Sequence, residues 1–336
     1  MIILLAIMAG IYSVPFVVSA AMRAISPEKI LGGSRSDRDF TTRESVVATF
    51  LNGLAGGILG YNPSRRSDYL SLNTFHRPFY VEGAYAGLQL AQYLAPWRAI
   101  RNRRIFKERH ERFVFLLTIG SGFSYGMRTL PTSFAIEPGL VKDIDPRLRL
   151  LFFDGCAFEK FVFGGTRNTR LLERGLFLGQ TPRIGFYEGA GRALWFLQPK
   201  FSDFCAYVSP LPTDCKANCY VGYGIACGFA GCERVADGAL RDYPREILNS
   251  VDFQTGLIIG LFARYYSDPI YIETLLAKNS GLLQQVKHAS VLFNDFWAQG
   301  VSYEQWRSTL KERFIADSAA LPYSQPEVAP PVGAQV

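Results

Sequence analysis

Apolar stretches with a central glycine recur along the chain at nearly constant spacing. These glycines stand at positions 83, 122, 155, 189, 222 and 256, and the differences between successive positions are 39, 33, 34, 33 and 34. A slightly shorter step back from Gly83 reaches Gly53, and one further step forward from Gly256 reaches Ala289. Most units carry a second small residue four positions later, as at Gly87 and Gly126. Positions i and i+4 share one helix face, so the pattern predicts repeated helices that pack closely through small side chains.

The stretches between these units also have helical length and apolar spacing, as in residues 235–250 and 269–286. Asp268 followed by Pro269 is a helix-start signal, with the aspartate as cap. Sustained alternation typical of strands is missing from the sequence. We therefore predict an all-α fold of about seven helix-turn-helix repeats of roughly 33–34 residues over 40–317, a tetratricopeptide-like αα-solenoid or toroid. The Trp, Tyr, Ala and Pro positions of a true tetratricopeptide repeat are not reproduced, and the Pro-rich segment 318–336 is predicted to be disordered.

Residues 1–22 form a separate apolar segment. Residues 2–22 carry no charge and have roughly the length of a membrane-spanning helix, about 20 residues. Basic residues follow at Arg23, Lys29, Arg35 and Arg38, which would place the rest of the chain on the cytoplasmic side of the inner membrane. A buried first helix and a cleaved signal segment are the two alternatives, and no basic residue precedes the apolar stretch as a signal requires.

Composition narrows the function classes. Hydrophobic residues make up 49% and charged residues 19%, which excludes a largely disordered chain. The net charge of +7 permits an acidic partner, but no nucleic-acid recognition motif accompanies it, and no nucleic-acid partner is expected. Three histidines are too few to favour a His-built metal site or ordinary hydrolase chemistry. Five of the six cysteines lie within 205–232 in spacings that match no common zinc site, so we expect buried free thiols, no metal and no cofactor.

An acidic residue precedes the repeat glycine in three units, at Glu82, Asp154 and Glu188. Equivalent positions of stacked repeats line one stripe of the array, so these carboxylates are predicted to converge. Aromatic neighbours would raise their pKa toward general-acid use, which makes them candidate catalytic residues. The alternative is a structural role in helix capping or ion pairing, for example between Glu188 and Arg192 at i+4.

Other residues are candidates for binding. The predicted substrate contacts are Tyr80, Phe153, Tyr187, Arg192 and Trp195, which flank the acidic positions. The charge run 98–112 is interpreted as a solvated helix face or as a docking surface for anionic lipid or an acyl carrier protein. Asp143 and Asp145 could bind Mg²⁺, but Asp145 before Pro146 is more typical of a helix start.

A series of short motifs occurs in a fixed order over residues 40–266. They include Phe79-Tyr80-Val81-Glu82-Gly83-Ala84, Asp145-Pro146-Arg147-Leu148-Arg149-Leu150, Asp154-Gly155-Cys156-Ala157-Phe158-Glu159 and Gly191-Arg192-Ala193-Leu194-Trp195-Phe196. In this order they resemble the uncharacterised UnbL-type family (domain of unknown function 1702), whose genes accompany enediyne polyketide synthases in bacteria. This chain has Phe158 where the family usually has His. The resemblance implies a role in secondary metabolism and supplies no known reaction.

Three functions are therefore expected as alternatives. The first is an accessory protein of enediyne-type polyketide biosynthesis, an antibiotic pathway, that binds and transforms a hydrophobic polyene by acid–base chemistry. The aromatic content of 14% suits such a ligand. The second is a non-catalytic repeat scaffold that recruits an acyl carrier protein, a polyketide synthase or the membrane. The third is a metal-independent isoprenoid or polyene cyclase, in which aromatic faces stabilise cations. A closed aromatic cavity around the three carboxylates would favour catalysis, and an open solvated groove would favour a scaffold.

Overall fold

The described part of the chain is built from helices alone, as the sequence predicts. The computed structural model describes residues 2–31, 40–60, 67–94, 111–128, 141, 144–164, 169–198, 200–238, 240 and 243–316. Several predicted features therefore lie outside the described residues, namely most of the charge run 98–112, Asp143 and the Pro-rich segment 318–336.

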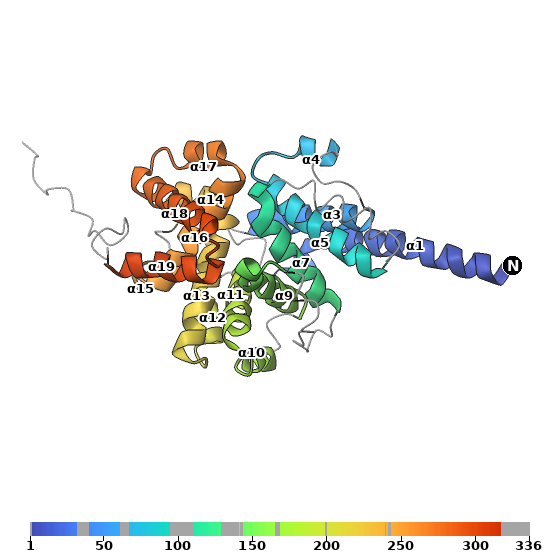
Figure 1. Ribbon diagram of the computed structural model, residues 1–336, viewed down its shortest axis with the longest axis horizontal. Helices are drawn as coiled ribbons and strands as arrows, with labels where there is room; N and C mark the ends of the chain where they lie inside the picture. Colours follow the sequence, from blue (N-terminus) through green and yellow to red (C-terminus); the bar gives the residue numbers. More distant parts are fainter. Residues whose placement is uncertain are drawn as a thin grey trace, which may run out of the picture.

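Long helices of 15 to 19 residues carry the repeat positions, one position to each helix. Each long helix packs against the next one in the chain (Figure 1), so consecutive repeats are neighbours in space. In order, they are α3 (Phe40–Ile58), α5 (Arg77–Leu94), α7 (Val114–Arg128), α9 (Arg149–Gly164), α11 (Gln180–Leu197), α13 (Thr213–Phe229), α16 (Val251–Ser267) and α18 (Ser280–Ala298).

The connecting segments contain only short helices in the described residues, so each long helix is followed by shorter ones. The predicted helix over 235–250 is broken, because Gly238 has a left-handed φ of 78° and Pro244 precedes a new start. The predicted helix over 269–286 ends at Leu275 and restarts at Ser280, where Asn279 accepts from the Leu282 N–H. The short elements are α4 (Ser67–Ser71), η3 (Glu111–Phe113), η4 (Pro146–Leu148), α10 (Thr169–Gly175), α12 (Phe201–Val208), α14 (Cys232–Ala236), α15 (Arg245–Leu248) and α17 (Pro269–Leu275).

The repeat glycines lie in the contacts between long helices, as predicted. A Cβ atom added at Gly222 of α13 would collide with the carbonyl oxygen of Glu188 in α11, and one at Gly256 would collide with that of Val221. The same is true of the other repeat glycines, each of which faces backbone of a neighbouring long helix. Only glycine allows this approach, which explains why a poor helix former recurs inside helices.

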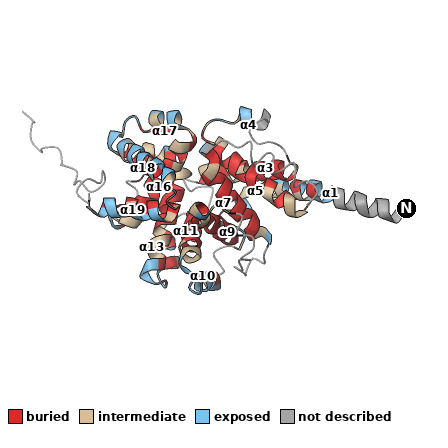
Figure 2. Cartoon of the chain, viewed as in Figure 1, coloured by how far each residue is buried: buried red, intermediate tan, exposed pale blue. Residues whose placement is uncertain are grey.

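The row of helices curls back on itself and does not extend as an open solenoid. Phe79 of α5 contacts Phe229 of α13 with ring centroids 5.2 Å apart, and Phe115 of α7 contacts Phe262 of α16 at 5.7 Å. Arg43 of α3 donates to the Phe196 carbonyl at the end of α11 at 3.2 Å. Helices α7, α9 and α11 are consequently buried over most of their length (Figure 2). The curl creates an interior toward which several repeats point.

The two ends of the described chain lie on opposite sides of this body (Figure 1). Helix α1 (Ile2–Ala24) contacts α3, and its Ser19 hydroxyl donates to the Ala55 carbonyl at 3.0 Å. Its Phe16 and Val17 are nevertheless exposed. Helix α2 (Pro27–Ile30) follows, and α19 (Tyr303–Ala316) closes the described chain. A search of the described residues finds no helix with the length and hydropathy needed to cross a bilayer.

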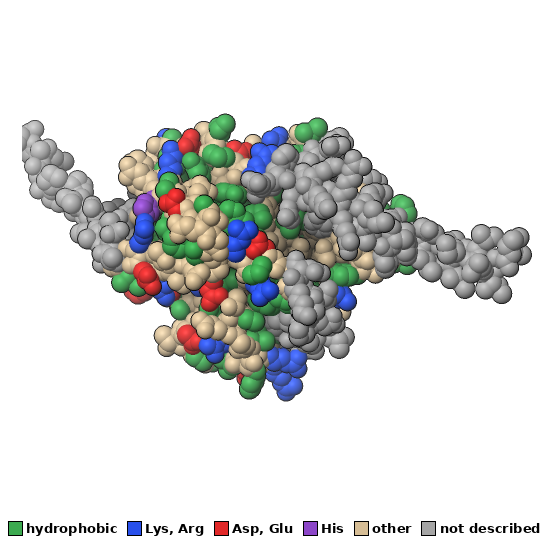
Figure 3. Space-filling model, viewed as in Figure 1, with side chains coloured by type: hydrophobic (Ala, Val, Ile, Leu, Met, Phe, Trp, Pro, Cys, Tyr) green, Lys and Arg blue, Asp and Glu red, His purple; other side chains and the backbone are tan. Residues whose placement is uncertain are grey.

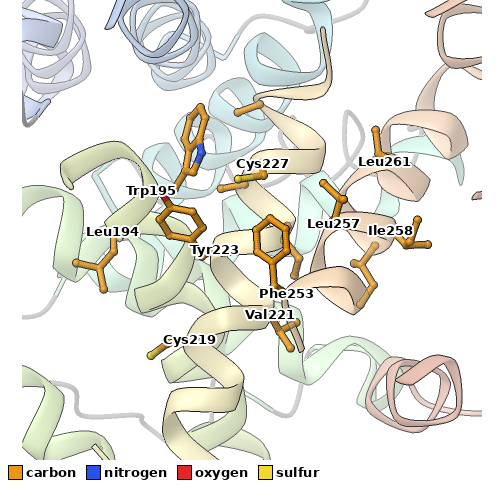
Figure 4. Close-up of a cluster of buried hydrophobic side chains, with 14 of the residues drawn as sticks. Leu194, Trp195, Cys219, Val221, Tyr223, Cys227, Phe253, Leu257, Ile258 and Leu261 are labelled. Carbon is orange, nitrogen blue, oxygen red and sulfur yellow. The ribbon is translucent and has the colours of Figure 1, made fainter. Parts of the chain in front are cut away.

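Packing in the second half of the array is dominated by apolar side chains between α11, α13 and α16 (Figure 4). Trp195 and Tyr223 point into this cluster beside Cys227, and Phe253 and Leu257 complete it from α16. All six cysteines are free thiols and five are buried, as predicted. The predicted helix starts are also confirmed: Asp145 accepts from the Arg147 N–H and Asp268 from the Tyr271 N–H.

Candidate functional site

The three acidic residues that precede repeat glycines occupy the same place in their helices. The backbone carbonyl of Glu82 in α5 faces Gly120, that of Asp154 in α9 faces Gly189, and that of Glu188 in α11 faces Gly222. Each carbonyl therefore lies against the next helix of the row. This shared register turns the three side chains toward the interior, where all are at most 5% exposed.

Arg192 joins two of these carboxylates. Its Nη1 lies 3.1 Å from Asp154 Oδ1, and its Nη2 lies 3.5 Å from Glu82 Oε1. The ring of Phe158 covers the guanidinium at 4.7 Å from its centroid. The i+4 ion pair between Arg192 and Glu188 considered from the sequence is thus replaced by pairs that link α11 to α5 and α9.

Glu188 is paired by the last helix of the described chain. Arg307 Nε of α19 lies 2.9 Å from Glu188 Oε2, and the Tyr303 hydroxyl donates to Glu188 Oε1 at 3.5 Å. Arg307 also donates to the Asn218 side chain at 2.6 Å. Sequence reasoning missed both α19 residues, because this helix lacks the repeat glycine and offers no signal of its own.

Burial dominates the protonation of this cluster. Burial raises the pKa of Asp154 to about 8; Arg192 opposes the shift, and the nearby carboxylates Glu188 and Glu82 add to it. The pKa of Glu82 and that of Glu188 are also raised, because burial outweighs the attraction of Arg192 and Arg307 respectively. Asp154 therefore keeps its proton near neutral pH, and burial favours the neutral form of Glu82 as well; a protonated carboxyl is the condition for a general acid.

A cavity of about 80 Å³ lies beside this cluster, inside the curl of helices. Its lining is aliphatic and aromatic except for Glu82 and Arg192, its only charged residues in the described chain. Among the described lining residues, Phe163 alone is exposed, and it marks the more open side of the cavity. The aromatic residues of the lining are Phe50, Phe79, Phe115, Phe123, Phe158, Phe163, Phe196 and Phe229.

The predicted site residues divide around this cavity. Glu82 and Arg192 line it, whereas Asp154 and Glu188 lie behind them in the ion-pair cluster. The remaining predicted substrate contacts are not part of the lining of this cavity. The Tyr187 hydroxyl donates to the Leu172 carbonyl at 2.8 Å, and Trp195 packs between α11 and α13. Phe153 lines a separate pocket together with Arg147. Tyr80 is buried near Tyr69. Their side chains therefore serve packing between helices.

A second buried guanidinium lies close to the cavity and was not singled out from the sequence. Arg264 of α16 is 1% exposed and donates to the Phe75 carbonyl at 2.9 Å. Its guanidinium lies about 5 Å from the ring centroids of Phe75, Phe79 and Phe229, and Phe79 and Phe229 line the cavity. Burial of this arginine depends on contacts with α5 and α13 that the sequence does not show.

The outer surface is less distinctive. Among the described residues of the face in Figure 3, acidic and basic side chains are interspersed and form no broad basic stripe. The search of the described residues also finds no cluster of His, Cys, Asp and Glu with the geometry of a metal site. The interior cavity and its charged wall are therefore the candidate site.

A comparison of the sequence with protein-family models identifies the same family as the motifs do. The family model described as "Protein of unknown function (DUF1702)" matches residues 33–314, which is most of the chain. The chain belongs to the DUF1702 family. Comparisons with curated proteins and with solved structures found no match.

The family match covers every long helix, so the charged wall and all of the cavity lining except Ile30 lie within the matched residues. Phe158 lines the cavity and covers Arg192. The adjacent Glu159 forms a buried pair with Lys160 at 3.3 Å, and burial raises its pKa to about 7 despite the lysine. This pair stabilises the contact with α7, since Lys160 also donates to the Gly126 carbonyl.

Proposed function

We propose that this protein binds an apolar, unsaturated small molecule in the central cavity and transfers a proton to it from Glu82. The observation that carries the proposal is an apolar, aromatic cavity whose charged wall, among the described residues, is one buried carboxyl and one guanidinium. Ligand sites of this kind combine an apolar lining with a few convergent polar groups and shifted pKa values. A polyene of enediyne-type polyketide biosynthesis fits this chemistry, and the motif resemblance supports that pathway.

The size of the cavity limits how the ligand binds. A volume of about 80 Å³ is smaller than the ~150 Å³ cavity that holds one benzene molecule in an engineered protein. It therefore takes one segment of an unsaturated chain, and the rest of a longer ligand extends past the exposed Phe163. Movement of this side chain would widen the entrance.

The chemistry requires only the residues of the charged wall. The Glu82 carboxyl gives its proton to an alkene carbon, and the neighbouring carbon becomes a cation. Loss of a proton from an adjacent C–H group to the Glu82 carboxylate restores the acid and yields an isomer of the ligand. Arg192, 3.5 Å from Glu82, stabilises the transient carboxylate, and Asp154 competes little for Arg192 when it is protonated. Aromatic faces lining the cavity stabilise the cation.

The test uses the compound that accumulates when the gene is deleted in a producing strain. The purified protein is incubated with that compound in D₂O, and mass spectrometry follows the product. Transfer of a proton from Glu82 predicts deuterium at carbon in the product. Glu82→Gln keeps the shape of the side chain but removes the proton, so the rate should fall by about 10²–10⁴.

A control variant separates chemistry from folding. Lys287→Gln changes an exposed pair with Glu273 far from the cavity and should leave the rate unchanged. Normal turnover by Glu82→Gln, or a product that gains no deuterium, would refute the proton transfer. Failure of the wild-type protein to bind or convert the accumulated compound would refute the ligand proposal as a whole.

A cyclase acting on an isoprenoid or polyene is a second candidate, favoured by the aromatic lining. The same Glu82 proton would then start a ring closure in place of a double-bond shift, and neither reaction uses a metal. Product analysis in the same experiment decides between them, because cyclisation lowers the number of double bonds in the product by one for each ring formed.

A non-catalytic scaffold is the alternative supported by the ion pairs. Asp154 and Glu188 are engaged with arginines behind the cavity wall, as purely structural carboxylates would be. In that case all three carboxamide variants, Glu82→Gln, Asp154→Asn and Glu188→Gln, would support normal product formation in the producing strain. Recruitment of an acyl carrier protein by the charge run 98–112 belongs to this alternative and rests on the sequence alone.

Attachment to the cytoplasmic face of the inner membrane is proposed for α1. Val14, Phe16 and Val17 are exposed apolar residues, and the basic Arg23 and Lys29 that follow are exposed as well. Apolar side chains next to basic ones favour an anionic bilayer surface. Phe16→Ser/Val17→Ser should reduce sedimentation with vesicles of anionic lipid, whereas Val291→Ser, at an exposed site on α18, should not. Equal sedimentation of both variants would refute this attachment.

A further inference from the structure

Arg264 is a deeply buried cation beside the cavity, and no carboxylate of the described chain contacts it. Its Nη2 donates to the Phe75 carbonyl at 2.9 Å and lies 3.7 Å from the Cys232 sulfur. Its Nε and Nη1 are buried and have no hydrogen-bond partner among the described residues. A nearby acid, Glu233, accepts from the Tyr271 hydroxyl at 2.9 Å, and the ring of this tyrosine also lies against the guanidinium.

This arrangement is unusual in energetic terms. A buried charge ordinarily has an opposite charge or a full set of hydrogen bonds, because its removal from water costs several kcal/mol per ion. Aromatic faces supply part of the missing stabilisation, at roughly 0.5–2 kcal/mol for each ring. Two N–H-bearing nitrogens nevertheless remain unsatisfied in the described structure, and such groups call for a specific partner.

The position of Arg264 relates it to the cavity. Phe79 and Phe229 contact the guanidinium and also line the cavity, and the preceding residue, Ala263, is part of the same lining. Glu82 lies three residues after Phe79 on α5, about one helical turn further along the wall. The cavity therefore lies between the proton donor Glu82 and a second cation, Arg264, which no described carboxylate contacts. The rings of Phe79 and Phe229 separate Arg264 from the cavity.

We propose that the ligand of this cavity is an unsaturated carboxylic acid, whose carboxylate binds Arg264 while its carbon chain passes Glu82. This inference rests on the proposed function and narrows its substrate class. A carboxylate brings one negative charge to one guanidinium, whereas a phosphate ester would bring up to two. A shift of the Phe79 or Phe229 ring admits the carboxylate to the Nε and Nη1 donors.

The experiment compares two probes that share one carbon chain and differ in the charge of the head group. cis-Parinaric acid is a fluorescent conjugated tetraene with a carboxylate, and its methyl ester has the same chain without the charge. Both are titrated into the full-length protein at pH 8, where the free acid is ionised. The wild-type protein should bind the acid at least about tenfold more tightly than the ester, because a charge-assisted hydrogen bond to a buried guanidinium is lost in the ester.

Variants then assign that preference to Arg264. Arg264→Gln should bind the two probes equally, and Arg264→Lys should keep part of the preference. Arg43→Gln is the matched control: Arg43 is another arginine that is 1% exposed, but it donates to carbonyls at the end of α11. Its removal should lower stability and leave the preference for the acid intact.

The outcomes separate this inference from the proposed function. Equal binding of the acid and the ester by the wild-type protein would overturn the role of Arg264 and leave ligand binding standing. If Arg264→Gln kept the preference for the acid, the role of Arg264 would likewise be overturned and ligand binding would stand. Failure of the wild-type protein to bind either probe would count against both proposals. If Arg264→Gln does not fold, Arg264→Lys and the wild-type comparison of the two probes still decide the question.

Discussion

Two buried arginines beside the same cavity have opposite surroundings. Arg192 contacts Glu82 and Asp154 from two different helices and has one aromatic ring over it. Arg264 has three phenylalanine rings and a tyrosine ring around it, one carbonyl and one thiol, and no carboxylate of the described residues in contact. One cation is in contact with two carboxyl groups of the fold, and the other is surrounded by aromatic rings.

The difference suggests a structural role for Arg192 and fits the binding role that we propose for Arg264. The contacts of Arg192 with Glu82 and Asp154 tie α5, α9 and α11 together, so this arginine contributes to the arrangement of the helices. No carboxylate of the described fold contacts Arg264, so an external anion would form a stronger interaction with Arg264 than with Arg192. Breaking a buried pair is costly because it leaves an uncompensated charge, whereas replacing an unpaired buried ion by an apolar side chain can be neutral.

The largest effect is expected where the helices that carry the paired arginine touch. Gly222→Val places a branched side chain against the Glu188 carbonyl and should cost more than about 4 kcal/mol of unfolding free energy, or prevent folding altogether. Circular dichroism and urea unfolding provide the measurement. Gly281→Ala is the control, because its added methyl meets open space in α18 and should stabilise the helix by up to about 1 kcal/mol. A stable Gly222→Val protein would contradict the close helix contact.

Removal of the paired arginine should have the next largest effect. Arg192→Met leaves Glu82 and Asp154 buried without a cation and should cost about 3 kcal/mol at pH 7 in urea unfolding. The loss should be smaller at pH 5 than at pH 9, because the Asp154 carboxyl, whose pKa is raised to about 8, is protonated at pH 5 and ionised in the wild-type protein at pH 9. A loss that does not change with pH would argue against charge as its cause.

Asp154 should make the stability depend on pH. Its pKa is about 8 in the folded protein and near 4 in the unfolded chain, so between these values the folded state holds a proton that the unfolded state has released. Stability therefore falls as pH rises through this window, by up to about 1.4 kcal/mol per pH unit. Asp154→Asn removes this dependence, and the difference between the two proteins in urea unfolding from pH 5 to pH 9 measures it. Parallel curves would contradict the raised pKa.

The smallest effect is expected at the unpaired arginine. Arg264→Met shortens the side chain only modestly, leaves no described carboxylate without its partner and retains contacts with the aromatic rings. It loses the hydrogen bond to Phe75 and the cation–ring attraction, and it relieves two unsatisfied donor nitrogens. The net change in urea unfolding should stay within about 1 kcal/mol. A loss as large as that of Arg192→Met would erase the distinction between the two sites.

The sequence predicted the recurring helix and the acidic stripe well, because both depend on local register. The regularly spaced glycine marks the closest contact of each long helix, and the residue before it has a fixed orientation relative to that contact. Glu82, Asp154 and Glu188 were found in this way. The predicted partners were less accurate: Tyr187 and Trp195 flank the acidic positions in sequence, but their helix positions turn them toward α10 and α13.

By itself, the sequence determined that the chain is helical, where the close helix contacts fall, and which carboxylates share a register. These properties depend on residues a few positions apart, whose relation is fixed by helix geometry. Only the tertiary structure decided that the row of helices curls and which carboxylates face the cavity. It also decided that α19 provides Arg307 for Glu188, and that Arg264 has no carboxylate partner among the described residues. Those outcomes depend on contacts between residues far apart in the chain, such as Glu82 and Arg192, and no local pattern specifies them.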